Sequence, residues 1–324
     1  MLKIEDIKAI HFEVSSRCPA GCPFCSRNQK VREYGNHDIS PADIQRLPAT
    51  FLAQLKRLSF SGNFGDLCAN PDFVDIVTRI KAVNREVAMD GETNGFLQDV
   101  HWWRRLGAVF QHGDLIFALD GLEDTHHLHR RGTRFQRVIK HLEAFVSGGG
   151  SASWKFVVFE HNEHQIAAAE SLAGDLGCSG FFVVSSREYT RQLRIPRTLD
   201  VEIKRDIYRS HLDRLPAGER RAVCKPFNDG SIYIAADGTV HPCCFAHCMY
   251  VTEHNRLFDY IVPLIERYRS RINFKTSDIG EIIEGPYFAA VERQAPGNSY
   301  CQLKCNRYRK EVREKLVLYE KRFI

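Results

Sequence analysis

The sequence predicts an α/β fold in which parallel strands alternate with helices and a smaller C-terminal domain follows. Strand segments rich in β-branched and aromatic residues lie at 9–15, 57–62, 85–91, 114–121, 154–160 and 180–186. Helical patterns fall between them, and this repeated order favours a parallel sheet or an open barrel. The composition changes after Ser186, which indicates where the second part of the chain approaches.

Amphipathic helices are predicted in the connections between the strands. Asn70 and Pro71 have the residue types of an N-cap and a first helical residue for PDFVDIVTRIKAV. The apolar side chains of this segment share one face: Phe73, Ile76, Val77 and Ile80. A second helix, RFQRVIKHLEAFVS, ends where three glycines begin at Gly148, and a third is expected from Asn162 through Leu176.

The C-terminal part is predicted to begin near residue 215, after an arginine-rich connection from Arg187 to Arg197 and a helix from about Val201. The segment SIYIAADGTVHPC is typical of a β-hairpin, with Asp237 and Gly238 in its turn. The segment CNRYRKEVREKLVLYEKRF, which begins at Cys305, predicts a cationic helix, most simply a solvated helix face.

Composition and charge exclude several classes of protein. The chain has 324 residues, of which 44% are hydrophobic and 26% charged, so an ordinary globular protein is expected. No apolar run approaches the roughly 18 residues of a membrane span, and acids interrupt the N-terminal segment where a signal peptide would lie. A net charge of +5 is small for this length. We therefore expect a cytoplasmic protein without a membrane or nucleic-acid partner.

Eleven cysteines stand out in this chain. An odd number with uneven spacing is a poor disulfide framework, so metal or cluster ligation is the better interpretation. Cys18, Cys22 and Cys25 follow the first predicted strand in the stretch SSRCPAGCPFCSRN. Three thiolates can bind three irons of a [4Fe–4S] cluster and leave the fourth iron open. Zinc is the alternative, although C-x3-C-x2-C is not the paired C-x2-C spacing of zinc ribbons.

This loop, placed after the first strand, resembles that of the radical S-adenosylmethionine (radical SAM) superfamily. The resemblance implies a partial (β/α)6 TIM-like barrel whose open iron is chelated by S-adenosylmethionine (SAM). It also implies reductive cleavage of SAM to a 5′-deoxyadenosyl radical, with electrons from a donor such as flavodoxin or ferredoxin.

Further motifs resemble those that surround SAM in this family. Phe64, Gly65 and Asp66 stand in the register of a Gly-Gly-Glu-type segment, with an acid that is one methylene shorter. ETNG after the third strand and LDGLEDTHHLHRRGTRF after the fourth are similar to two other family stretches. The resemblance implies that the cofactor-binding residues are Phe24, Gly65, Asp66, Thr93, Asn94, Arg131 and Asn162.

The C-terminal part resembles the SPASM and twitch extensions of this family, which hold auxiliary clusters. Cys224, Gly238 and Cys243 give a C-x13-G-x4-C pattern, and Cys301 and Cys305 are the cysteines near the end of the chain. The resemblance implies a partial barrel over residues 1–215 and a twitch domain, a β-hairpin plus helix, over 216–324. Four thiolates would then complete one auxiliary [4Fe–4S] cluster.

The residues that act on substrate are less constrained by the sequence. Asp120 and Glu160 end the fourth and fifth strands, where a base for proton removal is expected, although capping or SAM-binding roles are equally compatible. Cys244 and Cys248 remain beyond the cluster ligands; each suits a buried core thiol, a replacement ligand or a hydrogen-atom donor. Cys248 is the candidate donor. Cys68 and Cys178 are expected in the core.

Three hypotheses follow for the function. The first is a radical SAM enzyme that oxidises or epimerises a small polar metabolite, such as a sugar or aminocyclitol. The second is the same chemistry on a ribosomally made peptide, to epimerise or crosslink it. Only seventeen residues precede Cys18, which favours the small molecule, since a fused peptide-recognition domain would need more. The third is a non-catalytic scaffold that binds an iron–sulfur cluster or zinc.

Overall fold

The computed structural model describes residues 2–29, 32–201, 222–252, 260–305 and 317–323. The chain divides into two compact units. The first unit comprises Met1–Cys18, Ser26–Ala88 and His211–Arg309, and the second comprises Pro19–Cys25, Met89–Ser210 and Lys310–Ile324. The domain boundary predicted near residue 215 and most of the helix predicted from Val201 lie outside the described residues.

The first unit contains four strands in the order β8-β7-β1-β2. These are β1 (Ala9–Phe12), β2 (Arg57–Phe60), β7 (Ser231–Ile234) and β8 (Val240–His241). β1 pairs in parallel with both β2 and β7, whereas β7 and β8 form the predicted antiparallel hairpin. Gly238 in its turn has φ +93°, a conformation that favours glycine. The hairpin therefore extends the sheet that begins with β1.

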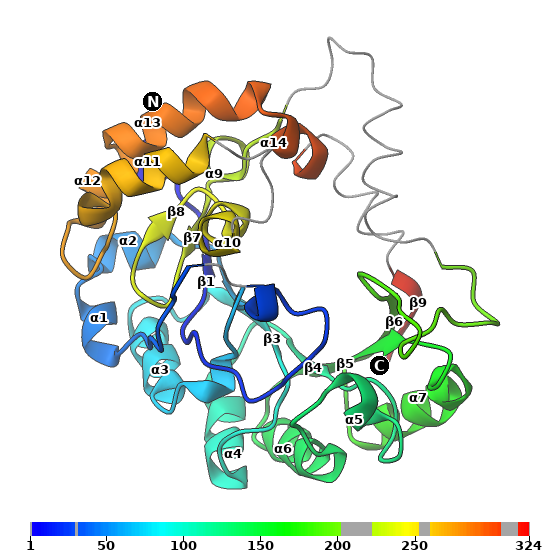
Figure 1. The fold of residues 1–324 in the computed structure, drawn as a ribbon. Helices are drawn as coiled ribbons and strands as arrows, with labels where there is room; N and C mark the ends of the chain where they lie inside the picture. Colours follow the sequence, from blue (N-terminus) through cyan, green and yellow to red (C-terminus); the bar gives the residue numbers. More distant parts are fainter. Residues whose placement is uncertain (1, 30–31, 202–221, 253–259, 306–316, 324) are drawn as a thin grey trace. The chain divides into compact units, whose positions relative to one another are not determined.

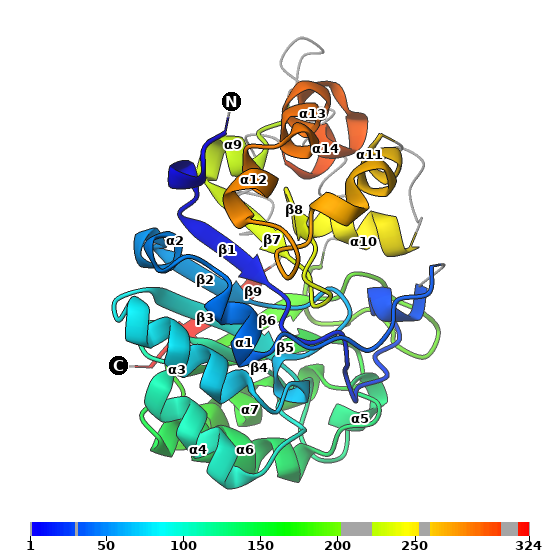
Figure 2. The same cartoon turned by 90° about the vertical axis from the view of Figure 1, so that its left-hand side faces the viewer.

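The helices of the first unit are α1 (Pro41–Gln45), α2 (Ala49–Gln54), α3 (Phe73–Val83), α9 (Lys225–Asp229), α10 (Cys244–Thr252), α11 (Ile261–Tyr268), α12 (Ile279–Ile283), α13 (Pro286–Gln294) and α14 (Ser299–Lys304). Short 3-10 turns are η1 (Ile4–Asp6), η2 (Ser26–Gln29), η3 (Leu67–Ala69), η7 (Arg269–Arg271) and η8 (Ala295–Gly297). α11 and α13 lie side by side (Figures 1 and 2).

Helix α3 buries the apolar face that the sequence predicted, but its N-terminus was predicted wrongly. Its N-cap is Asp72. The Asn70 side chain is buried, and its amide donates to the carbonyls of Val14 (2.9 Å) and Ile39 (2.8 Å). Asn70 therefore fastens two loops together, because burial of its amide requires these hydrogen bonds.

The second unit contains the strands β3 (Ala88–Thr93), β4 (Leu115–Ala118), β5 (Ala152–Val158), β6 (Gly180–Ser185) and β9 (Val317–Arg322) in that order. The pairs β3–β4, β4–β5 and β5–β6 are parallel, as predicted. Its helices are α4 (Val100–Val109), α5 (His126–His129), α6 (Phe135–Ser147) and α7 (Ile166–Asp175), with the 3-10 turn η4 (Glu163–Gln165). α4 and α6 lie side by side (Figure 2).

The cationic helix predicted at the C-terminus is wrong for its last residues. β9 is a strand that pairs antiparallel with the edge of β6, so that its backbone groups complete that sheet. Lys321 also forms an ion pair with Glu170 at 2.5 Å. Residues 306–316 of the predicted helix lie outside the described residues. Within the described ranges, every helix is too short or too polar to cross a membrane.

Candidate active site and auxiliary cysteines

The loop from Pro19 to Cys25 is held in the second unit by two anchors. The Gly21 amide donates to the carbonyl of Arg131 at 2.7 Å. Phe24 packs against the buried cluster of Val157, Phe159 and Leu193. The Cys25 amide also donates to the Cys22 carbonyl at 3.2 Å. Two of the three predicted ligands, Cys22 and Cys25, therefore lie on a loop with fixed ends.

Arg130 contacts the thiol of Cys22. Its Nη1 lies 3.9 Å from Cys22 Sγ, and its side chain is only 13% exposed. Burial raises the pKa of the Cys22 thiol, and the positive charge of Arg130 opposes this rise. A cation beside a cysteine favours the thiolate, which is the form that binds metal.

Asp120 holds Arg130 in place. Its Oδ2 accepts hydrogen bonds from Arg130 Nε (2.5 Å) and His129 Nδ1 (2.6 Å), and its Oδ1 accepts one from the Val157 amide (2.8 Å). Burial alone would raise the pKa of Asp120, but the charge of Arg130 and these hydrogen bonds outweigh it and hold the pKa well below its usual range. Both oxygens of Asp120 therefore serve the structure around Arg130, which differs from the predicted role as a base.

Asn162 is also committed to the fold. Its amide donates to the carbonyls of Asp120 (3.2 Å) and Val157 (3.0 Å), and its oxygen accepts from the Phe159 amide (2.7 Å). These bonds join the ends of β4 and β5. The Asn162 side chain therefore has a structural role, whereas a cofactor-binding role was predicted for it.

The other predicted residues of the second unit lie near strand ends. Thr93 Oγ1 and Asn94 Oδ1 accept hydrogen bonds from backbone amides two residues ahead and brace the turn after β3. The Arg131 side chain is exposed and donates to Gln192 Oε1 at 3.4 Å. Glu160 forms ion pairs with Arg194 (2.6 Å) and with Arg197.

In the first unit, a buried glutamate supports the Phe64-Gly65-Asp66 segment. Glu13 Oε1 accepts from the amides of Phe64 (2.7 Å) and Gly65 (3.0 Å), and Tyr233 donates its hydroxyl to Oε2 (2.7 Å). A Cβ on Gly65 would lie 1.7 Å from the Ser15 carbonyl oxygen. Glycine is therefore required at position 65 because the backbone of another segment passes directly against it.

Asp66 and Cys18 are also fixed in the first unit. The Asp66 amide donates to the Arg17 carbonyl at 2.8 Å, and its Oδ1 accepts from the Cys68 amide at 3.0 Å. The carbonyl of Cys18 accepts from Arg27. Cys68 is fully buried, and Cys178 in the second unit nearly so, as predicted for core residues.

The four predicted auxiliary ligands all belong to the first unit and lie close enough to interact electrostatically. Burial raises the pKa of Cys224 and Cys243, and the negative charges of neighbouring cysteines raise it further. Burial also raises the pKa of Cys301 to about 12, against a hydrogen bond with Tyr260 whose hydroxyl lies 3.6 Å from Sγ. The Val223 amide donates to the Cys305 carbonyl at 2.5 Å, which ties the two ends of this cysteine group together.

The two remaining cysteines lie on α10, one turn apart. Cys244 is hydrogen-bonded to the His11 imidazole, which also contacts the Ser61 carbonyl through Nε2 at 2.5 Å. Cys248 is half-buried, and its charge acts on the nearby Tyr300 hydroxyl. The structure therefore gives Cys244 a polar partner that the sequence did not reveal.

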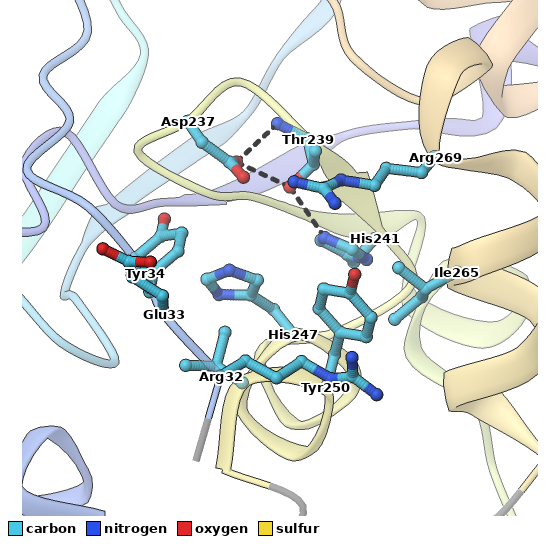
Figure 3. A pocket seen from close by; sticks show the side chains of 11 residues that line it. Arg32, Glu33, Tyr34, Asp237, Thr239, His241, His247, Tyr250, Ile265 and Arg269 are labelled. Atoms are coloured by element: carbon cyan, nitrogen blue, oxygen red, sulfur yellow. Dashed lines mark hydrogen bonds between the residues drawn. The ribbon is translucent and has the colours of Figure 1, made fainter. Parts of the chain in front are cut away.

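A cavity of about 350 Å³ opens in the first unit (Figure 3). Rings dominate its walls: the centroid of His247 lies 5.0 Å from that of Tyr34 and 5.2 Å from that of His241. Burial lowers the pKa of His241 to about 3, so this ring is neutral at physiological pH. Arg32 stacks over the Tyr250 ring at 4.8 Å. The other lining residues are Glu33, Asp237, Thr239, Val251, Ile265 and Arg269.

These donor sets fit iron–sulfur clusters. All eleven cysteines are free thiols. Three thiols on a short loop would leave one iron of a cubane open, whereas four thiols would close the coordination of a second cluster. Within the described ranges, no three Cys, His, Asp or Glu side chains converge on the position of a single metal ion.

Two families match the chain. Residues 12–169 match the radical SAM superfamily, and residues 224–306 match SPASM, an iron–sulfur cluster-binding domain. No curated protein matches the sequence significantly.

Solved structures share the fold at low sequence identity. Streptococcus suis SuiB bound to S-adenosylmethionine is 16% identical, with a TM-score of 0.60 over 95% of this chain and 75% of SuiB. SuiB bound to its precursor peptide SuiA is 16% identical, with a TM-score of 0.59 over 97% of this chain and 74% of SuiB. Native anSMEcpe with bound AdoMet and Cp18Cys peptide is 14% identical, with a TM-score of 0.53 over 95% of each chain.

The parallel sheet, the cysteine loop and these matches define a radical SAM enzyme with an α/β partial barrel, which confirms the predicted fold class. The chain belongs to the radical SAM superfamily and carries a C-terminal SPASM iron–sulfur domain. Its cofactors are accordingly a [4Fe–4S] cluster with SAM and auxiliary iron–sulfur.

Sequence reasoning missed Glu13, Arg130 and His247. Glu13 had a visible signal, because an acid inside the apolar run AIHFEVS must be buried with partners. Arg130 adjoins Arg131 in the RRG stretch, and the sequence does not distinguish which of the two turns inward. His247 had no comparable signal, since it lies among apolar residues of α10.

Proposed function

We propose that this radical SAM enzyme oxidises or epimerises a small polar metabolite of the sugar or aminocyclitol class. Cys18, Cys22 and Cys25 would hold the catalytic cluster, and Cys224, Cys243, Cys301 and Cys305 one auxiliary [4Fe–4S] cluster. SAM, when bound to the catalytic cluster, would supply a 5′-deoxyadenosyl radical for abstraction of a substrate hydrogen. The observation that supports a small substrate is the ring-lined cavity of the first unit.

The size and lining of this cavity match a single polar ring. A volume of about 350 Å³ is at the lower end of ligand pockets, roughly 300–1,000 Å³. Its walls offer aromatic faces together with hydroxyl, imidazole, carboxylate and guanidinium groups, which suit a molecule with several hydroxyls. A polypeptide segment would need a longer groove.

Glu160 is the better of the two candidate bases. Its side chain is 14% exposed, whereas Asp120 is fully buried and accepts hydrogen bonds on both oxygens. Arg194 and Arg197 both form ion pairs with Glu160. In this proposal an alcohol substrate gives a hydrogen atom to the 5′-deoxyadenosyl radical, a proton to Glu160 and an electron to the auxiliary cluster, and Asp120 positions Arg130.

In an epimerisation the substrate radical needs a hydrogen atom from a thiol. Cys248 is the proposed donor, and Cys244 with its His11 partner is the alternative on the same helix. An external flavodoxin or ferredoxin would supply electrons. We further infer a cytoplasmic location, because iron–sulfur assembly and free thiols require a reducing compartment.

Peptide modification is the second candidate function. The observation that favours it is the fold shared with SuiB and anSMEcpe, whose structures include bound peptides. In that case the cavity would accept one side chain of a peptide substrate.

Anaerobic reconstitution with labelled substrates tests this proposal. We expect dithionite-dependent release of 5′-deoxyadenosine and transfer of deuterium into it from labelled aminocyclitols or sugars. Arg269→Gln in the cavity wall should lower this transfer at least tenfold, while Arg267→Gln, an exposed neighbour outside the lining, should not. Deuterium transfer from a peptide alone would contradict the metabolite assignment. If C248A inverts a stereocentre and takes up solvent deuterium normally, Cys248 is not the donor.

A further inference from the structure

We infer that Arg130 is a positioning residue that sets the reduction potential of the catalytic cluster by holding a fixed positive charge against its ligand Cys22. The inference rests on the proposed ligation by Cys22 and does not depend on the substrate. The observation that supports it is the distance of 3.9 Å between Arg130 Nη1 and Cys22 Sγ.

The guanidinium is fixed from its other side. Asp120 Oδ2 accepts from Arg130 Nε at 2.5 Å, and Asp120 is itself fully buried. His129 shares the same oxygen, and the Val157 amide occupies the other. Arg130 therefore has one orientation, with Nε turned to Asp120 and Nη1 turned to the sulfur.

The backbone around Arg130 also fixes it against the cysteine loop. Gly132 has φ +83°, and a Cβ there would lie 2.8 Å from the Pro19 carbonyl oxygen. The Arg131 carbonyl accepts the Gly21 amide at 2.7 Å. Residues 130–132 thus pack directly along the loop that bears Cys22, so the Arg130 charge keeps its distance from the sulfur.

A fixed cation at this distance acts mainly on the reduced cluster. Reduction adds one negative charge to the cluster and its thiolates, and a nearby cation stabilises the more negative state. Hydrogen bonds to cluster sulfurs and local net charge are known controls of such potentials. The buried setting strengthens the effect, because water screens little there. Asp120 offsets part of this charge, because its carboxylate is hydrogen-bonded to the same guanidinium.

The neighbouring Arg131 cannot take this role from its present position. Its side chain is exposed and reaches Gln192. The sequence predicted a cofactor role for Arg131. The structure adds a separate role for Arg130.

Three variants of the full chain test the inference. Each is reconstituted anaerobically and assayed for iron content, and its reduction is followed by electron paramagnetic resonance at set potentials, without substrate. Arg130→Gln removes the charge, Arg130→Lys retains it, and Arg134→Gln removes an exposed arginine four residues along.

We expect Arg130→Gln to lower the ratio of reduced to oxidised catalytic cluster at least tenfold at a fixed potential, which corresponds to about 59 mV for one electron. Arg130→Lys should recover most of this loss, and Arg134→Gln should behave as the wild type. A fully loaded Arg130→Gln protein with the wild-type potential overturns the inference, as does Arg130→Lys that loses as much as Arg130→Gln.

If Arg130→Gln takes up no iron, Arg130→Lys decides alone: a potential near that of the wild type supports the inference, and a tenfold loss overturns it. Cys22→Ala separates this result from the ligand assignment, because an intact catalytic cluster in that variant would contradict ligation by Cys22 instead. Substrate identity enters none of these measurements, so failure of the metabolite proposal leaves them unaffected.

Discussion

Two fully buried carboxylates, Asp120 and Glu13, have pKa values shifted in opposite directions. Asp120 faces a buried guanidinium, whose charge and hydrogen bond lower its pKa despite burial. Glu13 accepts hydrogen bonds only from neutral donors, and burial raises its pKa because they do not compensate for lost hydration. Asp120 is therefore ionised under all ordinary conditions, whereas Glu13 makes the folded state sensitive to pH.

Replacement of Glu13 by glutamine should remove this sensitivity of the folded state to pH. Because the pKa of Glu13 is higher in the folded chain, its contribution to stability is largest at acidic pH and is lost as pH rises through the folded pKa. Glutamine can still accept the Phe64 and Gly65 amides and can donate to Tyr233. We therefore expect the stability of E13Q relative to the wild type to rise as pH increases above about 4, measured by urea unfolding.

The control for Glu13 is Glu284→Gln, which removes an ion pair with Lys3 at 3.0 Å on the surface. The pKa of Glu284 is lowered by its hydrogen bond with Lys3, so its small contribution is present at neutral pH and is lost on acidification. An E13Q protein that becomes less stable than the wild type as pH rises would contradict the prediction.

Helices α4 and α6 of the second unit approach backbone to backbone. A Cβ at Gly107 of α4 would lie 2.1 Å from the Phe145 carbonyl oxygen, and one at Gly148, just after α6, would lie 2.2 Å from the Arg104 carbonyl oxygen. Trp103 packs beside this contact, with its ring 5.7 Å from that of His141. The close approach lets both helices bury their apolar faces over the sheet.

The substitution Gly107→Ala has two opposite effects on stability, one from helix propensity and one from packing. Alanine favours a helix interior over glycine by about 1 kcal/mol. The new Cβ would meet a carbonyl of α6 rather than a movable side chain, and overpacking of this kind costs about 1–3 kcal/mol or more. We expect a net loss of about 0–2 kcal/mol or more in the free energy of unfolding, measured with urea.

Gly174→Ala in α7 is the matched control, because its nearest neighbour is a ring carbon of Phe323 at 3.2 Å, which can shift. That variant should be neutral or more stable by up to about 1 kcal/mol. If both substitutions stabilised the protein equally, the close packing of α4 on α6 would not be the reason for glycine at position 107.

The elements that the sequence predicted well have strong local patterns. All six strands were found, although β1 ends at Phe12 and β4 at Ala118, earlier than predicted. Beyond these ends, the side chains of Glu13 and Asp120 accept hydrogen bonds from the amides of Phe64 and Val157. The boundaries of α6 were predicted correctly, because its apolar face and the glycines that follow it indicate the same helix. β9 was assigned to a helix because its charged residues give no strand signal, and only the free edge of β6 makes it a strand.

At the scale of the whole molecule, the chemistry of the cysteines was easier to predict from the sequence than the geometry of the cavity. Cysteine spacing was enough to predict the cluster type and the family, because few sites need three thiols so close together. The cavity was beyond prediction, since Tyr34, Asp237, His247 and Arg269 come from segments far apart in the chain. Such a set is assembled only by the fold, and no local pattern marks it.

The auxiliary cysteine group connects cofactor content to the stability of the whole chain. Burial raises the pKa of Cys224, Cys243 and Cys301, so in the absence of metal these thiols stay protonated in an apolar setting. In the proposed auxiliary site they would bind iron as thiolates, and the free energy of binding would add to the free energy of folding. These cysteines come from three separate segments of the first unit, so one cluster would join them.

Loss of one auxiliary ligand should therefore change iron content and stability together. We expect Cys224→Ala to bind about four irons in place of about eight, and to unfold about 5 °C lower or more after reconstitution. It should still release 5′-deoxyadenosine with dithionite, because the catalytic cysteines are unchanged, but should no longer oxidise substrate. Cys178→Ala, which removes a buried thiol of the second unit, should keep the full iron content. Full iron in Cys224→Ala, or a loss of four irons in Cys178→Ala, would show that the auxiliary ligands lie elsewhere.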